Sequence, residues 1–483
     1  MADTHPCAIV VLAAGAGTRM KSAKQKTLHE IGGRSLLGHA LHAAAGVNPE
    51  HLVAVVGHQR DQVSPAVEDI AQELDREIAQ AVQEEQNGTG HAVQCGLEPL
   101  EGFEGTVIVT NGDVPLLRPE TIQGLRETHE ANHNAVTVLS IELADPSGYG
   151  RVLHAEDGSV TAIVEHKDAT EAQRAVTEVN SGVFAFDSAV LREALTKLTT
   201  DNAQGELYIT DVLEIARANG HNVGAHLAED SEELSGVNDR VQLAAAGRAL
   251  NKRMVEAAMR GGATIVDPAT TWIGVNVTIG QDVTIHPNTQ LWGATSIADG
   301  AEIGPDTTLT NMQVGMNASV VRTHGFDSVI GTAATVGPFT YIRPGVIVGE
   351  EGKLGGFVEA KKAQIGRGTK VPHLTYIGDA TVGDYSNIGA SSVFVNYDGV
   401  NKHHTTIGSH VRTGSDTMFI APVTVGDGAY SGAGTVIKDD VPPGALAVSG
   451  GKQRNIEGWV QKKRPGTAAA EAAERAQTGN NNE

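Results

Sequence analysis

A short repeat decides the fold of the second half of the chain, and residues 278–291, TIGQDVTIHPNTQL, show it most clearly. An isoleucine or leucine recurs there every six residues, and the same spacing returns in two later runs. The repeated positions are Ile279, Ile285, Leu291, Ile297, Ile303 and Leu309; then Ile330, Val336, Ile342, Val348 and Leu354; then Ile407, Phe419, Val425 and Ile437, with Thr413 and Ser431 filling two turns. A six-residue repeat predicts a parallel β-helix, with one short strand per repeat and three strands per coil.

The repeat is interrupted twice, at residues 313–329 and at residues 393–406. Insertions in a solenoid map to loops on its outside, where binding groups can gather. The second interruption is rich in polar side chains: Asn396, Tyr397, Asp398, Asn401, Lys402, His403 and His404. We therefore expect an external loop at both places.

Residues 1–240 follow a different pattern, in which short apolar runs alternate with helical stretches. The expected strands lie at 9–13, 52–56, 106–109 and 135–141, and two of the expected helices lie at 65–80 and 119–132. This alternation predicts a mostly parallel sheet with helices on both faces. A helical linker at 241–261 is expected before a solenoid domain at 262–464, and the tail at 465–483, rich in Ala, Glu and Asn, is expected to be disordered.

Composition argues against several classes of protein. Acidic residues number 58 and basic residues 36, a net charge of −22, so the surface should repel nucleic acid. Two cysteines cannot form a disulfide framework and favour a reducing compartment. No apolar run approaches the ~20 residues of a membrane helix, and the apolar stretch at 8–14 runs into a glycine loop rather than a cleavage site. We expect a cytoplasmic protein that binds neither nucleic acid nor membranes.

Two motifs at strand ends in the front half indicate a nucleotide site. The segment LAAGAGTRM, residues 12–20, follows the first strand, and Lys26 lies close behind it. Its glycines allow backbone N–H groups to face a phosphate, whose charge Arg19 and Lys26 can neutralise. Asp113, in Asn111-Gly112-Asp113, follows the strand at 106–109 and can hold Mg²⁺. Taken alone, the glycines could form a structural turn and Asp113 could cap a helix.

With further motifs, the front half resembles the sugar-phosphate nucleotidyltransferases. These motifs are Gly88-Thr89, Gly148-Tyr149-Gly150-Arg151, Ile163-Val164-Glu165-His166-Lys167, Asn180-Ser181-Gly182 and Gly236-Val237-Asn238-Asp239-Arg240. The hexapeptide solenoid narrows the resemblance to the bifunctional bacterial N-acetylglucosamine-1-phosphate uridyltransferase/glucosamine-1-phosphate acetyltransferase family, over the chain to about residue 460. The resemblance implies a Rossmann-like α/β nucleotidyltransferase domain, a left-handed parallel β-helix, and a homotrimer formed through the β-helix.

The resemblance also implies two reactions. The solenoid would acetylate glucosamine-1-phosphate with acetyl-CoA, and the front domain would then join the product to UMP from UTP. The products would be UDP-N-acetylglucosamine, a cell-wall precursor, and pyrophosphate. UTP and the sugar nucleotide would be bound by Leu12, Ala13, Ala14, Gly15, Lys26, Gln83, Gly88, Thr89, Asn111, Gly112, Asp113, Gly150, Glu165, Asn180 and Asn238.

The resemblance also gives Arg19 and Lys26 a catalytic role at the phosphates, and it assigns Mg²⁺ to Asp113 and Asn238. Two positions depart from the family pattern. Gln25 stands where the family usually has Pro, and Asn111 stands where it usually has Tyr. Both departures could change the rigidity of the loop or the affinity for the nucleotide.

For acetyl transfer, the resemblance places the general base at His373 and has Glu359 orient its ring. Glucosamine-1-phosphate would be bound by Arg343, Lys361, Tyr376, Asn387 and Lys402, and acetyl-CoA by Ala390, Asn396, Tyr397, Ser415 and Ala433. On the residues alone, His373 could be structural, and Lys361 with Lys362 could be a solvated charge pair. Gly450 stands where some members have an arginine for coenzyme A, and Trp459 could fold over a neighbouring chain.

Two other functions are compatible with parts of the sequence. One is a single-activity nucleotidyltransferase with a regulatory or oligomerising solenoid, which would leave Glu359, His373 and Lys361 without a task. The other is a non-enzymatic binding scaffold. A metal-dependent solenoid enzyme of the γ-carbonic anhydrase type is disfavoured, because the histidines do not have the spacing of that family.

Overall fold

The computed structural model describes residues 5–156 and 158–479, and the chain divides into two compact units, one up to Asn317 and one from Ala318. The first unit holds the α/β domain, the linker helix and the first coils of the solenoid. The second holds the remaining coils and the C-terminal helices. The expected domain limits at 240 and 262 therefore differ from this division, which falls inside the repeat.

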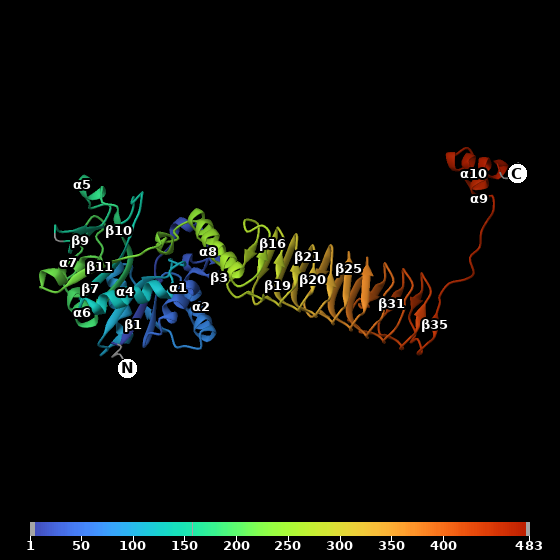
Figure 1. Ribbon diagram of the computed structural model, residues 1–483, viewed down its shortest axis with the longest axis horizontal. Helices are drawn as coiled ribbons and strands as arrows, with labels where there is room; N and C mark the ends of the chain where they lie inside the picture. Colours follow the sequence, from blue (N-terminus) through green and yellow to red (C-terminus); the bar gives the residue numbers. More distant parts are fainter. Residues whose placement is uncertain (1–4, 157, 480–483) are drawn as a thin grey trace. The chain divides into compact units, whose positions relative to one another are not determined.

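The α/β domain (Figure 1) is built on a nine-stranded sheet in the order β11-β7-β10-β6-β1-β4-β5, with β8 paired to β10 and β9 paired to β8. Its strands are β1 (Cys7–Leu12), β4 (His51–Val56), β5 (Ala79–Val82), β6 (Thr106–Asn111), β7 (Val136–Glu142), β8 (Arg151–His154), β9 (Val160–Val164), β10 (Glu178–Asp187) and β11 (Val223–Leu227). Strand β1 runs parallel to both β4 and β6, and β10 runs antiparallel to β6 and β7. The prediction of a mostly parallel sheet is confirmed.

Helices cover the sheet on both faces. They are α1 (Leu36–Gly46), α2 (Arg60–Glu73), α3 (Thr89–Gly96), α4 (Pro119–Ala131), α5 (Glu171–Arg174), α6 (Ser188–Leu195) and α7 (Asp211–Ala218). Helix α4 matches its prediction closely, since Pro119 occupies the first helical position, where no backbone donor is needed. Helix α2 begins five residues before Pro65 and ends at Glu73, because residues 79–82 are instead drawn into the sheet beside β4.

The linker forms helix α8 (Arg240–Arg260), as the sequence predicts. Its N-terminus is capped by Asp239, whose carboxylate accepts hydrogen bonds from the backbone N–H groups of Val241 and Gln242. Leu250 of α8 packs with Ile31 and Leu36 in a small apolar cluster. The cap and the cluster together fix where α8 leaves the α/β domain.

The coils of the first unit run from β12 to β19. Their strands are β12 (Thr264–Ile265), β13 (Trp272–Ile273), β14 (Thr278–Ile279), β15 (Thr284–Ile285), β16 (Thr289–Trp292), β17 (Ser296–Ile297), β18 (Glu302–Ile303) and β19 (Thr307–Val314). Each strand pairs in parallel with the strand one coil later, so that Ile265, Ile285 and Ile303 stack on one another. The apolar residues of the repeat therefore form the core of the coils, as predicted.

The second unit continues the coils from β20 to β35. Its strands include β20 (Ser319–Val320), β21 (Thr323–Ile330), β22 (Thr335–Val336), β23 (Thr340–Ile342), β24 (Ile347–Val348), β25 (Lys353–Gly356), β26 (Glu359–Ile365), β27 (Lys370–His373), β28 (Tyr376–Val382), β29 (Val393–Val395), β30 (Thr405–Ile407), β31 (Met418–Ile420), β32 (Val423–Val425), β33 (Tyr430–Ser431), β34 (Val436–Ile437) and β35 (Leu446–Ala447). One buried column runs through Ile330, Val348, Ile365, Val382, Ile407 and Val425. The predicted β-helix is confirmed.

Of the two interruptions, only the second is a loop. Residues 396–404 connect β29 to β30 outside the strands. Residues 313–329 instead lie mainly in β19, β20 and β21, so the loop expected there is not found. In this stretch buried residues such as Val314 and Val320 still point inward, but the spacing between inward residues shortens, which hides the six-residue period.

The C-terminal tail also differs from the prediction. Helix α10 (Ala468–Gly479) occupies most of residues 465–483, helix α9 (Trp459–Lys463) precedes them, and residues 480–483 lie outside the described residues. The alanines of residues 468–473 have a high helix propensity, which explains α10 in a segment otherwise poor in apolar groups. Over residues 5–156 and 158–479, no helix is both long enough and apolar enough to cross a membrane.

Candidate functional site

The sheet brings the two nucleotide motifs of the front half together. Leu12 at the end of β1 pairs with Asn111 at the end of β6, and the backbone N–H of Gly112 donates to the carbonyl of Leu12 at 2.9 Å. The glycine loop and Asp113 therefore meet at the carboxyl edge of the sheet, where open α/β sheets bind ligands.

Two cavities open at this edge. The first, of about 350 Å³, is lined by Leu12, Ala13, Ala14, Gly15, Lys26, Thr27, Gln83, Gln86, Gly88, Thr89, Ala92, Asn111, Asp113 and Glu206. The second, of about 230 Å³, is lined by Leu12, Thr89, Asn111, Gly148, Tyr149, Gly150, Glu165, Asn180, Ser181, Gly182, Phe184, Ile209 and Thr210. The cavities share Leu12, Thr89 and Asn111. The residues predicted to bind the nucleotide line the first cavity, and those predicted to bind the sugar line the second, which adjoins it.

The glycine loop is held by side-chain amides. Gln25, which is buried, donates to the carbonyl of Gly15 at 3.0 Å and accepts from the backbone N–H of Thr27 at 2.6 Å. Gln86 donates to the carbonyl of Ala14 at 2.8 Å. Gln25 thus ties the lysine segment to the loop by hydrogen bonds. Asn111, the other departure from the family pattern, donates to the carbonyl of Gly182 at 3.3 Å.

The predicted cations lie against the predicted metal ligands. Lys26 forms an ion pair with the carboxylate of Asp113, and Arg19 donates to the side-chain oxygen of Asn238 at 2.8 Å. The backbone N–H of Val237 donates to the carbonyl of Asp113 at 2.9 Å, which holds Asn238 beside the Asp113 segment. Arg19 and Asn238 do not line the first cavity, although this pairing connects them to its rim.

These oxygen donors fit Mg²⁺, a hard cation that takes few protein ligands and keeps positions for water and phosphate oxygens. In the described residues, no group of three or more His, Cys, Asp or Glu side chains could hold a metal ion. One carboxylate and one amide oxygen are too few ligands for a closed, all-protein metal site. They suit a metal ion that binds together with the phosphates of the nucleotide.

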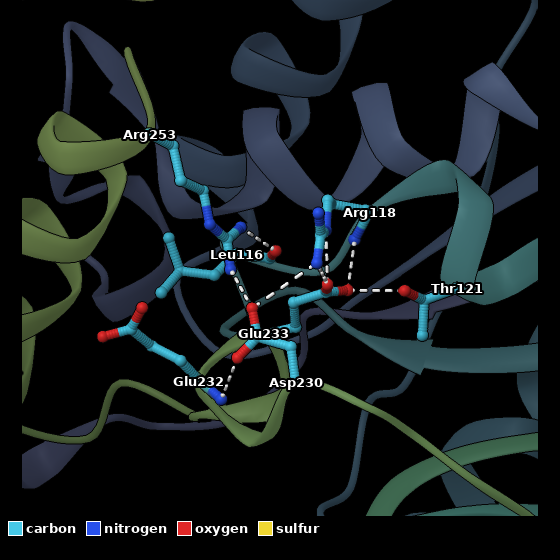
Figure 2. Close-up of polar contacts among 7 residues, drawn as sticks. All are labelled: Leu116, Arg118, Thr121, Asp230, Glu232, Glu233 and Arg253. Atoms are coloured by element: carbon cyan, nitrogen blue, oxygen red, sulfur yellow. Dashed lines mark hydrogen bonds and ion pairs between the residues drawn. The ribbon is translucent and has the colours of Figure 1, made fainter. Parts of the chain in front are cut away.

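A polar network anchors the segment that carries Asn238 (Figure 2). The buried carboxylate of Glu233 forms an ion pair with Arg118 and accepts from the hydroxyl of Thr121 at 2.5 Å. Asp230 lies 3.4 Å from both Arg118 and Arg253, and Arg253 of α8 donates to the carbonyl of Leu116 at 2.7 Å. The network ties residues 230–233 to the start of α4 and to α8. The segment that carries Asn238 is therefore fixed on its N-terminal side by this network and on its C-terminal side by the Asp239 cap.

The second cavity is acidic. Burial, with Asp168 and Asp211 adding to it, raises the pKa of Glu165. A methyl group added at Gly150 would lie 3.3 Å from Oε1 of Glu165, so the carboxylate packs against this glycine. Such a carboxyl group can bind a sugar hydroxyl without a cation beside it.

We expect Asp211→Asn to stabilise the protein more at pH 7.5 than at pH 4.5. Burial, followed by Glu214 and Asp168, raises the pKa of Asp211 from 3.8 to about 6, so the fold disfavours its ionised form. The wild type therefore loses stability as pH rises from about 4 to 6. The gain should be about 1–2 kcal/mol at pH 7.5 and smaller at pH 4.5, since the N-terminus of α7 partly compensates the charge. Urea unfolding at both pH values measures it, with exposed Asp69→Asn as the control; an equal gain at both values would contradict the shift.

On the solenoid, a cluster of polar side chains gathers on one outer face of the second unit. Glu359 and Tyr376 are register partners in neighbouring strands, as are Lys361 and Gly378. Arg343 forms a 3.0 Å ion pair with Glu359, and Lys361 lies 4.0 Å from Asp379. The cluster therefore brings three of the predicted residues, Arg343, Lys361 and Tyr376, onto adjacent coils.

Lys402 reaches this cluster from the loop at 396–404. Its side chain, followed by burial, lowers the pKa of Lys361, while Asp379 acts in the opposite direction. In the same loop, the carboxylate of Asp398 accepts from the backbone N–H groups of Val400 and Asn401 and lies 2.7 Å from the His403 ring. The ammonium groups of Lys361 on β26 and Lys402 in the loop are neighbours and together form a site for an anion such as a phosphate.

In the described part of the chain, no hydrogen bond or ion pair joins His373 to Glu359, the group predicted to orient it. His373 ends β27, where it pairs in register with Gly356, and its side chain is exposed. Across the described chain its ring has no hydrogen bond, and Glu359 instead pairs with Arg343.

The predicted acetyl-CoA residues follow a column of small side chains. Ala390, Ser415 and Ala433 each come directly after a small residue, Gly389, Gly414 and Gly432. A methyl group at Gly389 would lie 2.2 Å from the Gly414 carbonyl, so these corners stack closely. Asn396 and Tyr397 begin the loop beside β29. For Asn387, only backbone pairing with Lys370 and Arg412 places it near this face.

Several lining residues are absent from the predicted set. Thr27, Gln86, Ala92 and Glu206 line the first cavity, and Tyr149, Ser181 and Thr210 line the second. Glu206 arrives through the pairing of residues 87–90 with Leu207, for which the sequence carries no signal. On the solenoid, Asp379 is the missed member. Gly450 and Lys452 are exposed, and Arg464 lies over the Trp459 ring at 5.8 Å.

Comparison with known proteins finds a matching family model and highly similar relatives. Residues 9–202 match the family described as the MobA-like NTP transferase domain. The chain is 85% identical over 477 residues to the bifunctional protein GlmU of Corynebacterium aurimucosum, covering 99% of this chain and 98% of that protein. It is 75% identical over 476 residues to the bifunctional protein GlmU of Corynebacterium efficiens, covering 99% and 98%. A solved structure of UDP-glucose pyrophosphorylase complexed with UDP-glucose is 18% identical, with a TM-score of 0.42, covering 52% of this chain and 100% of that chain.

Proposed function

The chain belongs to the family of bifunctional GlmU proteins, and we propose that its two activities reside at the two sites described above. The protein acetylates glucosamine-1-phosphate with acetyl-CoA and transfers UMP from UTP to N-acetylglucosamine-1-phosphate, giving UDP-N-acetylglucosamine and pyrophosphate. The single-activity alternative is not favoured, because the bifunctional relatives align with 99% of the chain, solenoid included. A cytoplasmic location stays a prediction.

Uridyl transfer is assigned to the pair of cavities in the first unit. The adjacency of a nucleotide cavity and a sugar cavity, with Asn111 in both, is the observation that carries this assignment. UTP would occupy the first cavity along Leu12–Gly15, Gln83, Gly88 and Thr89, and the sugar phosphate would occupy the second against Gly150, Glu165 and Asn180. The phosphate oxygen of the sugar then attacks the α-phosphorus of UTP as the bond to pyrophosphate breaks.

Charge neutralisation is the main task of the chain in this reaction. Arg19 and Lys26 would leave Asn238 and Asp113 and turn to the phosphates when the nucleotide binds. Asp113 and Asn238 would then hold Mg²⁺, which neutralises phosphate charge when bound. The ion pair of Lys26 with Asp113 and the hydrogen bond of Arg19 to Asn238 support this exchange, because each cation already contacts a proposed metal ligand.

Acetyl transfer is assigned to the outer face of the second unit. Arg343, Lys361 and Lys402 would bind the phosphate of glucosamine-1-phosphate, with Tyr376 and Asn387 on the sugar. The amine nitrogen attacks the thioester carbonyl carbon, the carbon–sulfur bond breaks, and coenzyme A leaves as the thiolate. His373 would accept the proton that the amine loses, as a neutral imidazole can near pH 7.

A homotrimer is supported by an exposed apolar stripe on the solenoid. Phe339, Phe357 and Leu374 occupy corners of successive coils and are 52%, 62% and 58% exposed. The rings of Phe339 and Phe357 stack at 5.1 Å, which makes the stripe continuous. His373 adjoins the stripe and is itself exposed, so a neighbouring copy covering the stripe would also enclose the general base.

Phe357→Glu is expected to convert the trimer to smaller species, because a carboxylate at the centre of the stripe would be buried without a partner. Light scattering at several protein concentrations measures the mass. Val266→Glu, also at an exposed apolar side chain, should leave the mass unchanged. A wild-type mass of one chain would contradict the trimer.

Two separate assays test the assignment of function. Thiol release from acetyl-CoA is measured with glucosamine-1-phosphate and no UTP. Pyrophosphate release from UTP is measured with N-acetylglucosamine-1-phosphate, Mg²⁺ and no coenzyme A. The wild-type chain should show both activities. Absence of the first would remove the acetyl site, and absence of the second would remove the uridyl site.

A further inference from the structure

Asp379 places a carboxylate inside the cationic cluster of the solenoid. Its side chain is 17% exposed and lies 4.0 Å from the ammonium of Lys361, which is 12% exposed. The positive charges of Lys402 and Arg343 also lower the pKa of Lys361. A carboxylate repels a phosphate, so the phosphate-binding role of the cations does not explain why Asp379 lies among them.

The closest contact of Asp379 is with Asn396. Nδ2 of Asn396 donates to Oδ2 of Asp379 at 2.6 Å and to the hydroxyl of Tyr376 at 3.2 Å. An ionised carboxylate only accepts hydrogen bonds, so it forces the amide nitrogen, rather than the amide oxygen, to face it. Asn396 is buried, and across the described residues its side-chain oxygen has no hydrogen-bond partner.

The backbone around this contact is built to hold it. A methyl group at Gly378 would lie 2.3 Å from the Tyr376 hydroxyl and 2.9 Å from Nδ2 of Asn396, so both groups pack directly on the glycine. Asp379 has a φ of 48°, in the left-handed region that Asp and Asn tolerate better than most residues. An asparagine can therefore replace it without a change of backbone.

We propose that Asp379 is a positioning residue for acetyl transfer, which orients the Asn396 amide so that its carbonyl oxygen accepts a hydrogen bond from a substrate N–H group. The inference rests on the proposed acetyltransferase function. The N–H group belongs either to the amine of glucosamine-1-phosphate or to an amide of the pantetheine arm of acetyl-CoA. In both cases Asp379 acts through Asn396 and does not itself touch the reacting atoms.

Asp379→Asn tests the proposal, since the variant keeps the shape of the side chain and loses the charge that fixes the amide. We expect kcat/KM for acetyl transfer to fall roughly 10- to 100-fold. A KM rise confined to glucosamine-1-phosphate assigns the hydrogen bond to the amine, and one confined to acetyl-CoA assigns it to pantetheine. Uridyl transfer should be unchanged, as it uses the first unit. Asp384→Asn, a carboxylate elsewhere on the coils that accepts from the Arg367 N–H, is the matched control.

A double-mutant cycle with Asn396→Ala separates positioning from a general structural effect. If Asp379 acts through Asn396, Asp379→Asn has little further effect in the Asn396→Ala background, and its melting temperature stays close to that of the wild type. Unchanged acetyl-transfer kinetics in Asp379→Asn, or a full additional loss in the double variant, would overturn the inference alone. A wild-type chain that releases no thiol would overturn the proposed function as well.

Discussion

Replacing His373 with alanine is expected to lower the kcat of acetyl transfer by roughly 10²- to 10⁴-fold, the usual contribution of a general base. The amine of glucosamine-1-phosphate must lose a proton to form the amide, and His373 is an exposed imidazole at the end of β27. Thiol release from acetyl-CoA under saturating substrates gives the rate directly.

The controls for His373→Ala are internal. Uridyl transfer by the same preparation should keep its wild-type rate, which shows that the chain is folded. His410→Ala removes another solenoid imidazole, whose ring stacks on that of Tyr385 with the centroids 5.4 Å apart and which is not among the predicted site residues, so it should leave thiol release intact. A His373→Ala chain that releases thiol at the wild-type rate would rule out this base.

Asp113→Asn is expected to lower uridyl transfer by roughly 10²- to 10³-fold, comparable to the loss of other groups that stabilise charge in a transition state. The substitution removes the carboxylate that pairs with Lys26 and that is proposed to hold Mg²⁺, but it keeps the shape of the side chain. Pyrophosphate release is measured over a range of Mg²⁺ concentrations. Thiol release should be unaffected.

Asp61→Asn is the matched control for Asp113→Asn, since Asp61 is exposed in the first turn of α2. It should leave pyrophosphate release and its dependence on Mg²⁺ unchanged. An Asp113→Asn chain that retains wild-type uridyl transfer at low Mg²⁺ would contradict the proposed role of the carboxylate.

The β-helix could be predicted because one apolar residue per strand, such as Ile285 or Leu291, repeats at a constant interval. The prediction is wrong for residues 313–329, where inward residues follow one another at shorter and uneven intervals while the strands continue. In the front domain, strand ends could be placed well enough to bring Leu12 and Asn111 together. The start of α2 at Arg60 could not be predicted, since a proline such as Pro65 usually marks the start of a helix or a break in it.

Within the candidate sites, the predicted cations and carboxylates depend on motifs, whereas their partners depend on the fold. The pairings of Lys26 with Asp113 and of Arg343 with Glu359 join separate strands or loops, and a single sequence does not encode which partner each group selects. Asp379 could not be predicted as a site residue for the same reason, because its proposed role depends on its hydrogen bond with Asn396, which lies one coil later.

The two variants together give the most direct test that one chain carries two independent sites. His373→Ala and Asp113→Asn are each supplied with glucosamine-1-phosphate, acetyl-CoA, UTP and Mg²⁺, alone and mixed, and UDP-N-acetylglucosamine is measured. Each variant alone should form almost none, and the mixture should form it, because Asp113→Asn releases the acetylated sugar phosphate that His373→Ala then uridylates. A mixture as inactive as either variant, with both chains folded, would contradict two separate sites.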